Sequence, residues 1–240
     1  MRKPMAYVFP VARDTRNMCC LSPVRKCLTF TVITCCMQWG FEAGAFHQTS
    51  CVVHVFDCTC DSTHGCRYDV PDDIKSRVFF HSKCLGAADH GEFLSWTSLL
   101  SHAGLREAPT LLKIDIEGWE YSALTGIIDK GEMMPQQIAV EFHWITGGVG
   151  GPYWGNRSLP EMMENAHNFA IDKSFLQAGR MQPYKHPPTY SYKTPGEMGA
   201  FGAMLFLKGG YLVVDRTDNP DCPHCCEMLL ARVVCPQRPL

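Results

Sequence analysis

The sequence predicts an α/β protein with a mostly parallel sheet that ends in a C-terminal antiparallel hairpin. Short runs rich in β-branched and aromatic residues, typical of buried strands, alternate with stretches that repeat apolar residues at helical spacing. Strands that alternate with helices favour a parallel sheet covered on both faces. The 240 residues are enough for one domain with a single sizeable core.

Five strands are expected before the hairpin, each a short apolar run. Their ranges are 28–34, 51–56, 77–81, 111–116 and 137–142. Helices are predicted over residues 41–48, 95–102, 119–130 and 198–208. The third of these helices repeats apolar residues on one face, and Gly131 after it is suited to a C-terminal cap. A strand is therefore followed by a helix several times in succession.

The C-terminal hairpin is expected from two apolar runs, 211–215 and 228–234, which flank the polar segment DRTDNPDCPHCC. Residues 158–161 fit a capping box with proline in the first turn, so a helix is predicted from there to about Phe169. The proline-rich stretch 180–196 is expected to be a long loop, and 144–196 an insertion or lid. We interpret 1–26 as an irregular N-terminal extension and 27–235 as the domain.

The composition limits which binding partners are expected, but it does not indicate the cellular compartment. Lys and Arg number 22 against 24 Asp and Glu, which gives no electrostatic reason to expect nucleic acid or an anionic membrane. No apolar run reaches the length of a membrane span, and no clear signal peptide is present. The segment LTFTVITCCM after Lys26 is more typical of a strand than of an anchor. Localisation stays open between cytoplasm and secretory pathway, and so does the oligomeric state.

Cysteine is abundant, with 14 residues in no regular framework. Those in apolar runs are interpreted as buried thiols, and they are Cys35, Cys36, Cys51 and Cys84. The motif Cys222-Pro-His224-Cys225-Cys226 has the C-x-x-C spacing of zinc sites, but a closed site needs four ligands and no second pair lies nearby in the sequence. Further ligands could approach only in space, from Cys58, Cys60, His64 and Cys66. We favour a turn that carries a disulfide or free thiols, with zinc as the alternative, and predict no metal site. A disulfide-rich secreted domain is a rival class.

Charged side chains gather where the predicted strands end. They are Asp57, Asp115, Glu117, Glu141 and His143. Ligands of parallel α/β sheets bind outside the carboxyl ends of the strands, so we expect the functional site at this edge.

Two alternatives stay open for each of the strongest candidates. Asp57 has the geometry to accept hydrogen bonds from both hydroxyls of a ribose, and equally to cap the loop that begins at Cys58. Asp115 and Glu117 lie two residues apart and point to one side of a strand, where their charges repel. A cation, a substrate amine or hydroxyl, a water or a divalent metal would relieve the repulsion. The structural alternative is that Lys113 and Lys130 neutralise the two carboxylates, or that Glu117 caps the helix at Gly118.

The string Lys113-Ile-Asp115-Ile-Glu117-Gly118-Trp-Glu120 resembles the K-[IV]-D-[IV]-E-G-x-E signature of FkbM-type methyltransferases and their methyltransferase-like relatives. Other segments are similar to that family in the same order and together span about 27–235. They are 51–57 (second strand with its acidic end), 77–91 (third strand and glycine loop), 138–143 (fifth strand) and 219–232 (closing strands).

The resemblance implies a Rossmann-like class I methyltransferase sheet of seven strands, with the last inserted antiparallel, that binds S-adenosyl-L-methionine across its rim. It implies that Asp57 holds the ribose and that the loop from Gly86 to Asp89 lies near the adenine. It places Asp115 and Glu117 beside the methyl donor as catalytic candidates.

The same resemblance gives His143 the role of a base or of a group that orients the substrate. The expected reaction is O-methyl transfer to a small-molecule or sugar-like acceptor.

The first turn departs from the family pattern. A glycine there lets the backbone approach the methionine part of the cofactor. Residues 34–42 of this chain offer only Gly40, next to the bulky Trp39, although Phe41-Glu42 resembles a pair that follows the turn in the family. Gly40 and Glu42 are therefore expected to bind the cofactor. The alternative is a degenerate member of the fold that acts as a binding module.

Overall fold

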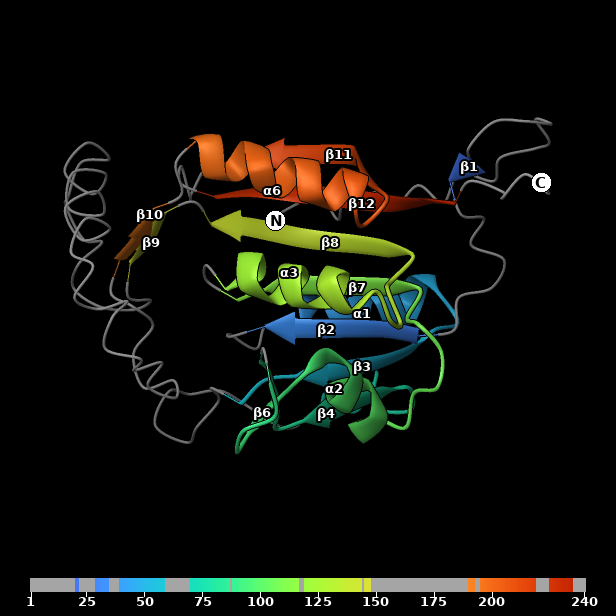
Figure 1. The fold of residues 1–240 in the computed structure, drawn as a ribbon. Coiled ribbons are helices and arrows are strands. Elements are labelled where there is room, and N and C mark those ends of the chain that lie inside the picture. The colour runs from blue at the N-terminus through green and yellow to red at the C-terminus, as the bar shows by residue number, and fades with distance from the viewer. Residues whose placement is uncertain are drawn as a thin grey trace, which may run out of the picture.

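The computed structural model describes ten segments of the chain (Figure 1). They are residues 20–21, 29–34, 39–58, 70–86, 88–116, 119–143, 145–147, 190–192, 195–218 and 225–234. Across these segments a twisted sheet carries helices on both faces.

The centre of the sheet is parallel. Its strands lie in the order β4-β3-β2-β7-β8, and each pairs in parallel with its neighbours. Their bounds are β2 (Thr29–Thr34), β3 (Val52–Phe56), β4 (Val78–His81), β7 (Leu111–Asp115) and β8 (Gln137–His143). All five were predicted from short apolar runs, and their ends agree with the prediction to within one residue.

The C-terminal hairpin completes the sheet. Strand β12 (Cys225–Val234) is inserted antiparallel next to β8, and β11 (Tyr211–Asp218) pairs antiparallel with β12 on its other side. The predicted α/β sheet, mostly parallel with a C-terminal antiparallel hairpin, is thereby confirmed. Both hairpin strands reach three residues further into the connecting segment than predicted, because pairing with each other and with β8 satisfies their backbone groups.

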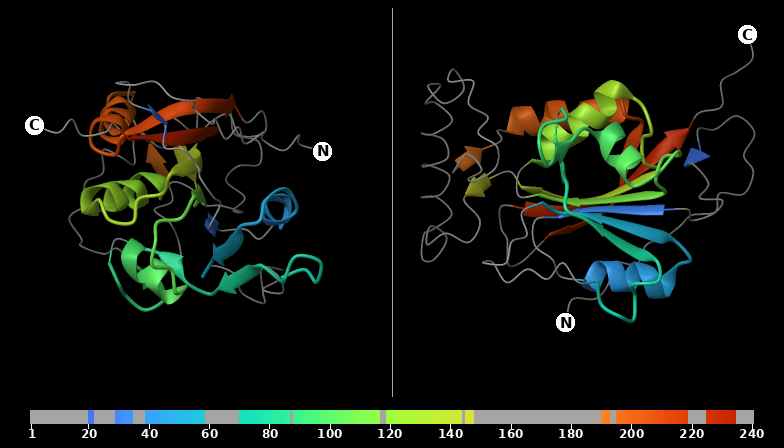
Figure 2. Two further views of the ribbon diagram at one scale, coloured as in Figure 1. Left: turned by 90° about the vertical axis from the view of Figure 1, so that its right-hand side faces the viewer. Right: turned by 90° about the horizontal axis from the view of Figure 1, so that it is seen from below.

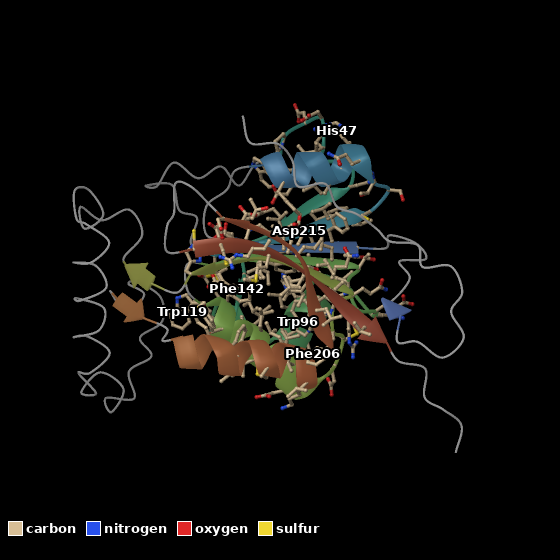
Figure 3. The ribbon with its side chains drawn as sticks, turned by 90° about the horizontal axis from the view of Figure 1, so that it is seen from above. His47, Trp96, Trp119, Phe142, Phe206 and Asp215 are labelled. Carbon is tan, nitrogen blue, oxygen red and sulfur yellow. A yellow bond between two sulfur atoms is a disulfide. The ribbon has the colours of Figure 1, made fainter. Side chains whose placement is uncertain are left out.

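Four helices among the described residues cover the two faces. Helix α1 (Gly40–Gln48) lies on one face, whereas α2 (Trp96–His102), α3 (Glu120–Lys130) and α6 (Pro195–Leu207) lie on the other (Figure 2). Trp96 and Phe142 pack between the sheet and the three helices, and His47 lies on the opposite side with α1 (Figure 3). No helix in the described segments is long and apolar enough to span a membrane.

Side chains of the central strands alternate between two apolar clusters. In β7, Leu112 and Ile114 pack on the side of α2 and α3, whereas Leu111 packs on the side of α1. Strand β8 alternates in the same way, with Ala139 on the α1 side. Because neighbouring residues of a strand point to opposite faces, Asp115 shares the α1 side with Leu111.

Helix α3 has the C-terminal cap that its sequence predicts. Gly131 adopts a left-handed conformation with φ 67°, and its N–H donates to the carbonyl of Ile127. Glycine is favoured here because a side chain makes this conformation costly.

Several short strands were not predicted. Strand β1 (Cys20–Leu21) pairs with Val233 and Val234, although 1–26 was expected to be irregular. Within the expected loop 180–196, β10 (Tyr190–Tyr192) pairs with β9 (Ile145–Gly147), and α6 begins at Pro195. Strands β5 (Cys84–Leu85) and β6 (Phe93–Leu94) pair with each other. The helix predicted up to Phe169 lies outside the described residues.

Candidate functional site

Asp57 and Asp115 lie at the same level of the sheet, at the carboxyl ends of its parallel strands. In the register, Ile33 pairs with Phe56 and Thr34 pairs with Asp115, so β2 runs between the two aspartates. Two strand spacings separate the strands that carry them, which is about 10 Å. The carboxyl ends of these strands form the left-hand rim of the sheet in Figure 1, and β9 and β10 lie beyond it. The structure thus brings together the two residues on which the sequence prediction depends.

Asp57 is fully buried at the end of β3. Its backbone N–H donates to the carbonyl of His81 at 3.2 Å, which anchors it to the neighbouring strand. The next residue, Cys58, forms a disulfide with Cys84. The end of β3 is therefore covalently tied to the segment that leads to Gly86.

The disulfides correct part of the interpretation of the cysteines. Cys51 and Cys84 were interpreted as buried thiols, but both are disulfide-bonded. Their burial is as expected, so apolar surroundings indicated burial without indicating the oxidation state. Cys35 and Cys36 lie outside the described residues.

Gly86 and Asp89, the two candidate residues in the loop after β5, both make structural contacts. A Cβ on Gly86 would lie 3.0 Å from the Cβ of Phe93 and 3.1 Å from the carbonyl oxygen of Ala88, so a larger residue would force these neighbours to move by a few tenths of an ångström. Asp89 Oδ1 accepts the N–H of Ser95 at 2.7 Å, and Oδ2 accepts the hydroxyl of Ser98 at 2.7 Å. These hydrogen bonds lower the pKa of Asp89 and hold it against the residue before α2 and against the first turn of that helix. A role of the two residues at the adenine stays a prediction.

Glu42 is a buried carboxylic acid in the first turn of α1. It is 4% exposed, and its Oε2 has no hydrogen-bond partner among the described residues. Burial raises the pKa of Glu42 to about 7, against the opposing effects of its own backbone N–H and of Lys113. An acceptor atom without a partner in a buried position is costly, so it is available to a ligand that brings a donor.

The positive charge of Lys113 acts on two carboxyl groups, because it lowers the pKa of Glu42 and forms an ion pair with Asp115. Its Nζ is 3.3 Å from Asp115 Oδ2. The other oxygen of Asp115, Oδ1, is buried with no hydrogen-bond partner in the described part of the chain. Neutralisation of Asp115 by Lys113, one of the two alternatives left open by the sequence, is thus present, and one oxygen of the carboxylate still has room for a donor. Glu117 and Gly118 lie outside the described residues.

Gly40 is the first residue of α1, and apart from its chain neighbours and its own helix backbone no described atom lies within 4 Å of the position that a Cβ would take. No packing contact in the described residues therefore requires glycine there. The preceding Trp39 packs against the apolar cluster on the α1 side of the sheet. A role for Gly40 in the approach of a cofactor stays a prediction.

His143 contacts Glu120, a residue that was not among the candidates predicted from the sequence. Glu120, the first residue of α3, is fully buried, and its Oε1 accepts the N–H of Ile116 at 2.9 Å. The same Oε1 lies 3.2 Å from Nδ1 of His143, which is 6% exposed. The one signal for Glu120 in the sequence was its place as the last letter of the K-x-D-x-E-G-x-E string. Its contact with a residue of the next strand could not be predicted from spacing.

Two groups of side chains have the spacing of metal ligands. Ligand atoms of Asp115, Glu120 and His143 lie within 4.8 Å of one another, as do those of Glu141, His143 and Cys225. Cys225 is disulfide-bonded, so its sulfur is not a thiolate ligand. In the first group, Lys113 and the N–H of Ile116 already occupy carboxylate oxygens. Asp115 Oδ1 has no hydrogen-bond partner among the described residues, so the prediction of no metal site stays untested at the first group.

The two described cysteines of the C-terminal motif lie in strand β12 and not in the predicted turn, because they pair with β8, but both of the predicted thiol states occur. Cys225 is disulfide-bonded, and Cys226 is a buried free thiol whose pKa is raised, chiefly by burial. Cys222 and His224 lie outside the described residues, so the zinc alternative stays untested.

No protein-family model matches the chain, and no curated protein sequence matches it either. The fold is similar to solved structures at low identity, of which three are described. A putative Zn-dependent alcohol dehydrogenase from Rhodobacter sphaeroides is 14% identical with a TM-score of 0.41, and 86% of this chain and 84% of that chain are covered. The 1,6-didemethyltoxoflavin-N1-methyltransferase of Burkholderia thailandensis, solved with S-adenosylhomocysteine, is 12% identical with a TM-score of 0.39 and coverages of 84% and 70%.

The third structure is the geranyl diphosphate C-methyltransferase of Streptomyces coelicolor A3(2), solved with Mg2+, geranyl diphosphate and S-adenosyl-L-homocysteine. It is 9% identical with a TM-score of 0.42, and 85% of this chain and 72% of that chain are covered. At these levels of identity and structural overlap the similarities do not assign a function.

Proposed function

We propose that the chain is an S-adenosyl-L-methionine-dependent methyltransferase that transfers a methyl group to an oxygen of a small-molecule or sugar-like acceptor. The observation that carries the proposal is the pair of aspartates at the carboxyl ends of β3 and β7. They lie at one level on either side of β2. Open α/β sheets bind nucleotides and nucleosides outside these strand ends.

The residues at the rim fit the chemical groups of this cofactor. S-Adenosyl-L-methionine offers a vicinal diol, a sulfonium cation and an ammonium group, all of which favour carboxylate partners. In this proposal Asp57 accepts the diol and Asp115 faces the sulfonium. The buried Oε2 of Glu42, which has no hydrogen-bond partner among the described residues, accepts the ammonium. Gly40 and the loop from Gly86 to Asp89 complete the cofactor contacts.

The cofactor, when bound, supplies a methyl group on a positively charged sulfur. The protein's contribution is to hold the acceptor oxygen in line with that methyl group and to take its proton. We assign the orientation of the acceptor to Asp115 and Glu117. His143 takes the proton, because an imidazole titrates near neutral pH.

Calorimetric titration with S-adenosyl-L-methionine and its demethylated product tests the proposal. We expect micromolar binding that weakens at least about 10-fold in Asp57→Ala, because each of the two hydrogen bonds from the diol to this charged acceptor is worth about 1.5–3 kcal/mol. Asp129→Ala is the matched control, because Asp129 is a half-exposed carboxylate at the other end of α3 that pairs with Lys208. No heat of binding at millimolar cofactor would contradict the proposal.

A second candidate is a degenerate protein of this fold that binds a ligand or partner without turnover. It is favoured by Gly40, which no packing contact among the described residues requires to be glycine, and by the bulky Trp39 beside it. This candidate predicts that the protein binds neither form of the cofactor. The same titration therefore separates the two functions.

A further inference from the structure

Two buried polar side-chain atoms at the start of α1 have no hydrogen-bond partner among the described residues. They are Nε1 of Trp39, the residue before the helix, and Oε2 of Glu42 in its first turn. The two residues are three positions apart, a spacing that places two side chains on the same side of a helix start. A buried donor or acceptor without a partner is costly, so two of them in one turn call for a ligand that satisfies both.

The two atoms require opposite partners. An indole N–H can only donate a hydrogen bond, whereas an ionised carboxylate can only accept one. The α-carboxylate and α-ammonium of an amino acid offer an acceptor and a donor side by side. We propose that Trp39 and Glu42 form a subsite for the amino-acid end of the cofactor, in which Trp39 Nε1 donates to the carboxylate and Glu42 gives up a proton to accept the ammonium. This inference rests on the proposed function and adds to it the role of Trp39 and the proton of Glu42.

The helix start supports the carboxylate half of this subsite. Helix α1 is nine residues long, and Trp39 at its N-cap position makes no side-chain cap hydrogen bond. The first N–H groups of a helix have no partner within the helix, and the helix dipole is positive at this end. A carboxylate beside the Trp39 indole therefore lies where the helix favours negative charge.

The surroundings of Glu42 disfavour its charge until a cation arrives. Glu42 is 4% exposed, and Lys113, the cation that acts on it, is already paired with Asp115 at 3.3 Å. Strand β2 carries no titratable side chain. The other charged or titratable groups on the neighbouring elements are Asp115 in β7, Asp57 after β3 and His47 in the last turn of α1.

Burial raises the pKa of Glu42 to about 7, so near neutral pH the carboxyl group is protonated in a large share of the molecules. An ammonium group next to Oε2 favours the ionised form, and the proton leaves to solvent. Binding of a ligand with an ammonium group should therefore weaken as the pH falls below about 7.

The test compares two ligands by calorimetry, without any turnover. S-Adenosyl-L-homocysteine carries the amino-acid group, whereas 5′-methylthioadenosine keeps the nucleoside and the sulfur but lacks that group. We expect the affinity for the first ligand to fall about 10-fold or more from about pH 7.5 to about pH 5.5, as Glu42 becomes protonated. The affinity for the second ligand should stay the same over this range.

Two variants separate the halves of the subsite. Trp39→Phe keeps an aromatic ring and loses the N–H, and Glu42→Gln loses the charge. Each should reduce the preference for S-adenosyl-L-homocysteine over 5′-methylthioadenosine about 10-fold, and Glu42→Gln should also abolish the pH dependence. The matched control is Trp96→Phe, which removes an indole N–H that donates to the carbonyl of Met133 on the other face of the sheet. It should leave the preference unchanged.

Affinity for 5′-methylthioadenosine shows whether each variant still folds and keeps the nucleoside site. Equal affinities of the wild type for the two ligands, or a preference that neither Trp39→Phe nor Glu42→Gln reduces, would overturn this inference while the nucleoside site stands. A pH-independent affinity of the wild type for S-adenosyl-L-homocysteine would likewise contradict the role of the Glu42 proton. Absence of binding of both ligands to the wild type would instead overturn the proposed function, so the two failures are distinguishable.

Discussion

Removal of the Cys58–Cys84 disulfide should destabilise the protein and also weaken cofactor binding. The disulfide closes a loop with a sequence separation of 26 residues. In the chain-entropy description, a loop of this length restricts the unfolded state by about 3.5 kcal/mol at 25 °C. Cys51 and Cys225 are also disulfide-bonded, so other cross-links already restrict the unfolded chain. We therefore expect Cys58→Ala/Cys84→Ala to lower the free energy of unfolding by about 2–3.5 kcal/mol.

Urea unfolding of the oxidised wild type and the double variant measures this loss, with the slope checked for a change in the unfolded state. Because the disulfide joins the residue after Asp57 to the strand that leads to Gly86, affinity for S-adenosyl-L-methionine should fall in the double variant as well. Cys226→Ala is the control for loss of a buried sulfur that forms no disulfide. A destabilisation below about 1 kcal/mol with an unchanged slope would refute the entropic reasoning.

Three further variants test separate parts of the structure. Tyr211→Phe removes the buried hydroxyl that donates to the carbonyl of Pro135 at 2.7 Å, and we expect urea unfolding to show a loss of about 1–3 kcal/mol. The free energy of unfolding of the wild type should fall relative to that of His81→Gln as the pH is lowered from 6.5 to about 4. Burial, followed by the neighbouring His54 and His102, lowers the pKa of His81 to about 4, so the unfolded chain takes up the proton first. A pH-independent difference between the two proteins would show that the shift is absent. Gly40→Ala should leave the free energy of unfolding within about 1 kcal/mol of wild type, since no atom of the described residues that surround this turn lies within 4 Å of the added Cβ, yet weaken cofactor binding. Unchanged cofactor affinity in Gly40→Ala would remove Gly40 from the site.

The sequence predicted the central sheet well because each of its strands is a buried apolar run. In β3, Val53, Val55 and Phe56 are fully buried, and burial on both faces is what a continuous apolar run indicates. The convergence of Asp57 and Asp115 followed from the same reasoning, since the carboxyl ends of neighbouring parallel strands meet at one edge. That argument needs no knowledge of side-chain contacts.

Short strands could not be predicted, because their pairing depends on distant residues. Cys20 and Leu21 become a strand only through Val233 and Val234, which lie more than two hundred residues away in the sequence. Two or three residues carry no periodicity of their own.

The pairing of Cys58 with Cys84 was equally hidden, because connectivity among 14 cysteines cannot be deduced from their spacing.

Side-chain partners at the site were the least predictable part. Asp89 was selected for its place in a glycine-bearing loop, yet both of its oxygens accept hydrogen bonds from residues at the start of α2. Glu120 lies in the first turn of a helix, where an acidic residue is ordinarily explained by the helix dipole and solvent exposure. Its burial against His143 depends on how α3 packs against β8, which cannot be predicted from the sequence.

A crystal structure of the protein grown with S-adenosyl-L-homocysteine would examine the assignment at the rim directly. We predict that both ribose hydroxyls lie within hydrogen-bond distance of the Asp57 carboxylate and that the sulfur lies over the end of β2, facing Asp115. Density for the ligand elsewhere on the molecule, or none at saturating concentration, would contradict a nucleoside site at these strand ends.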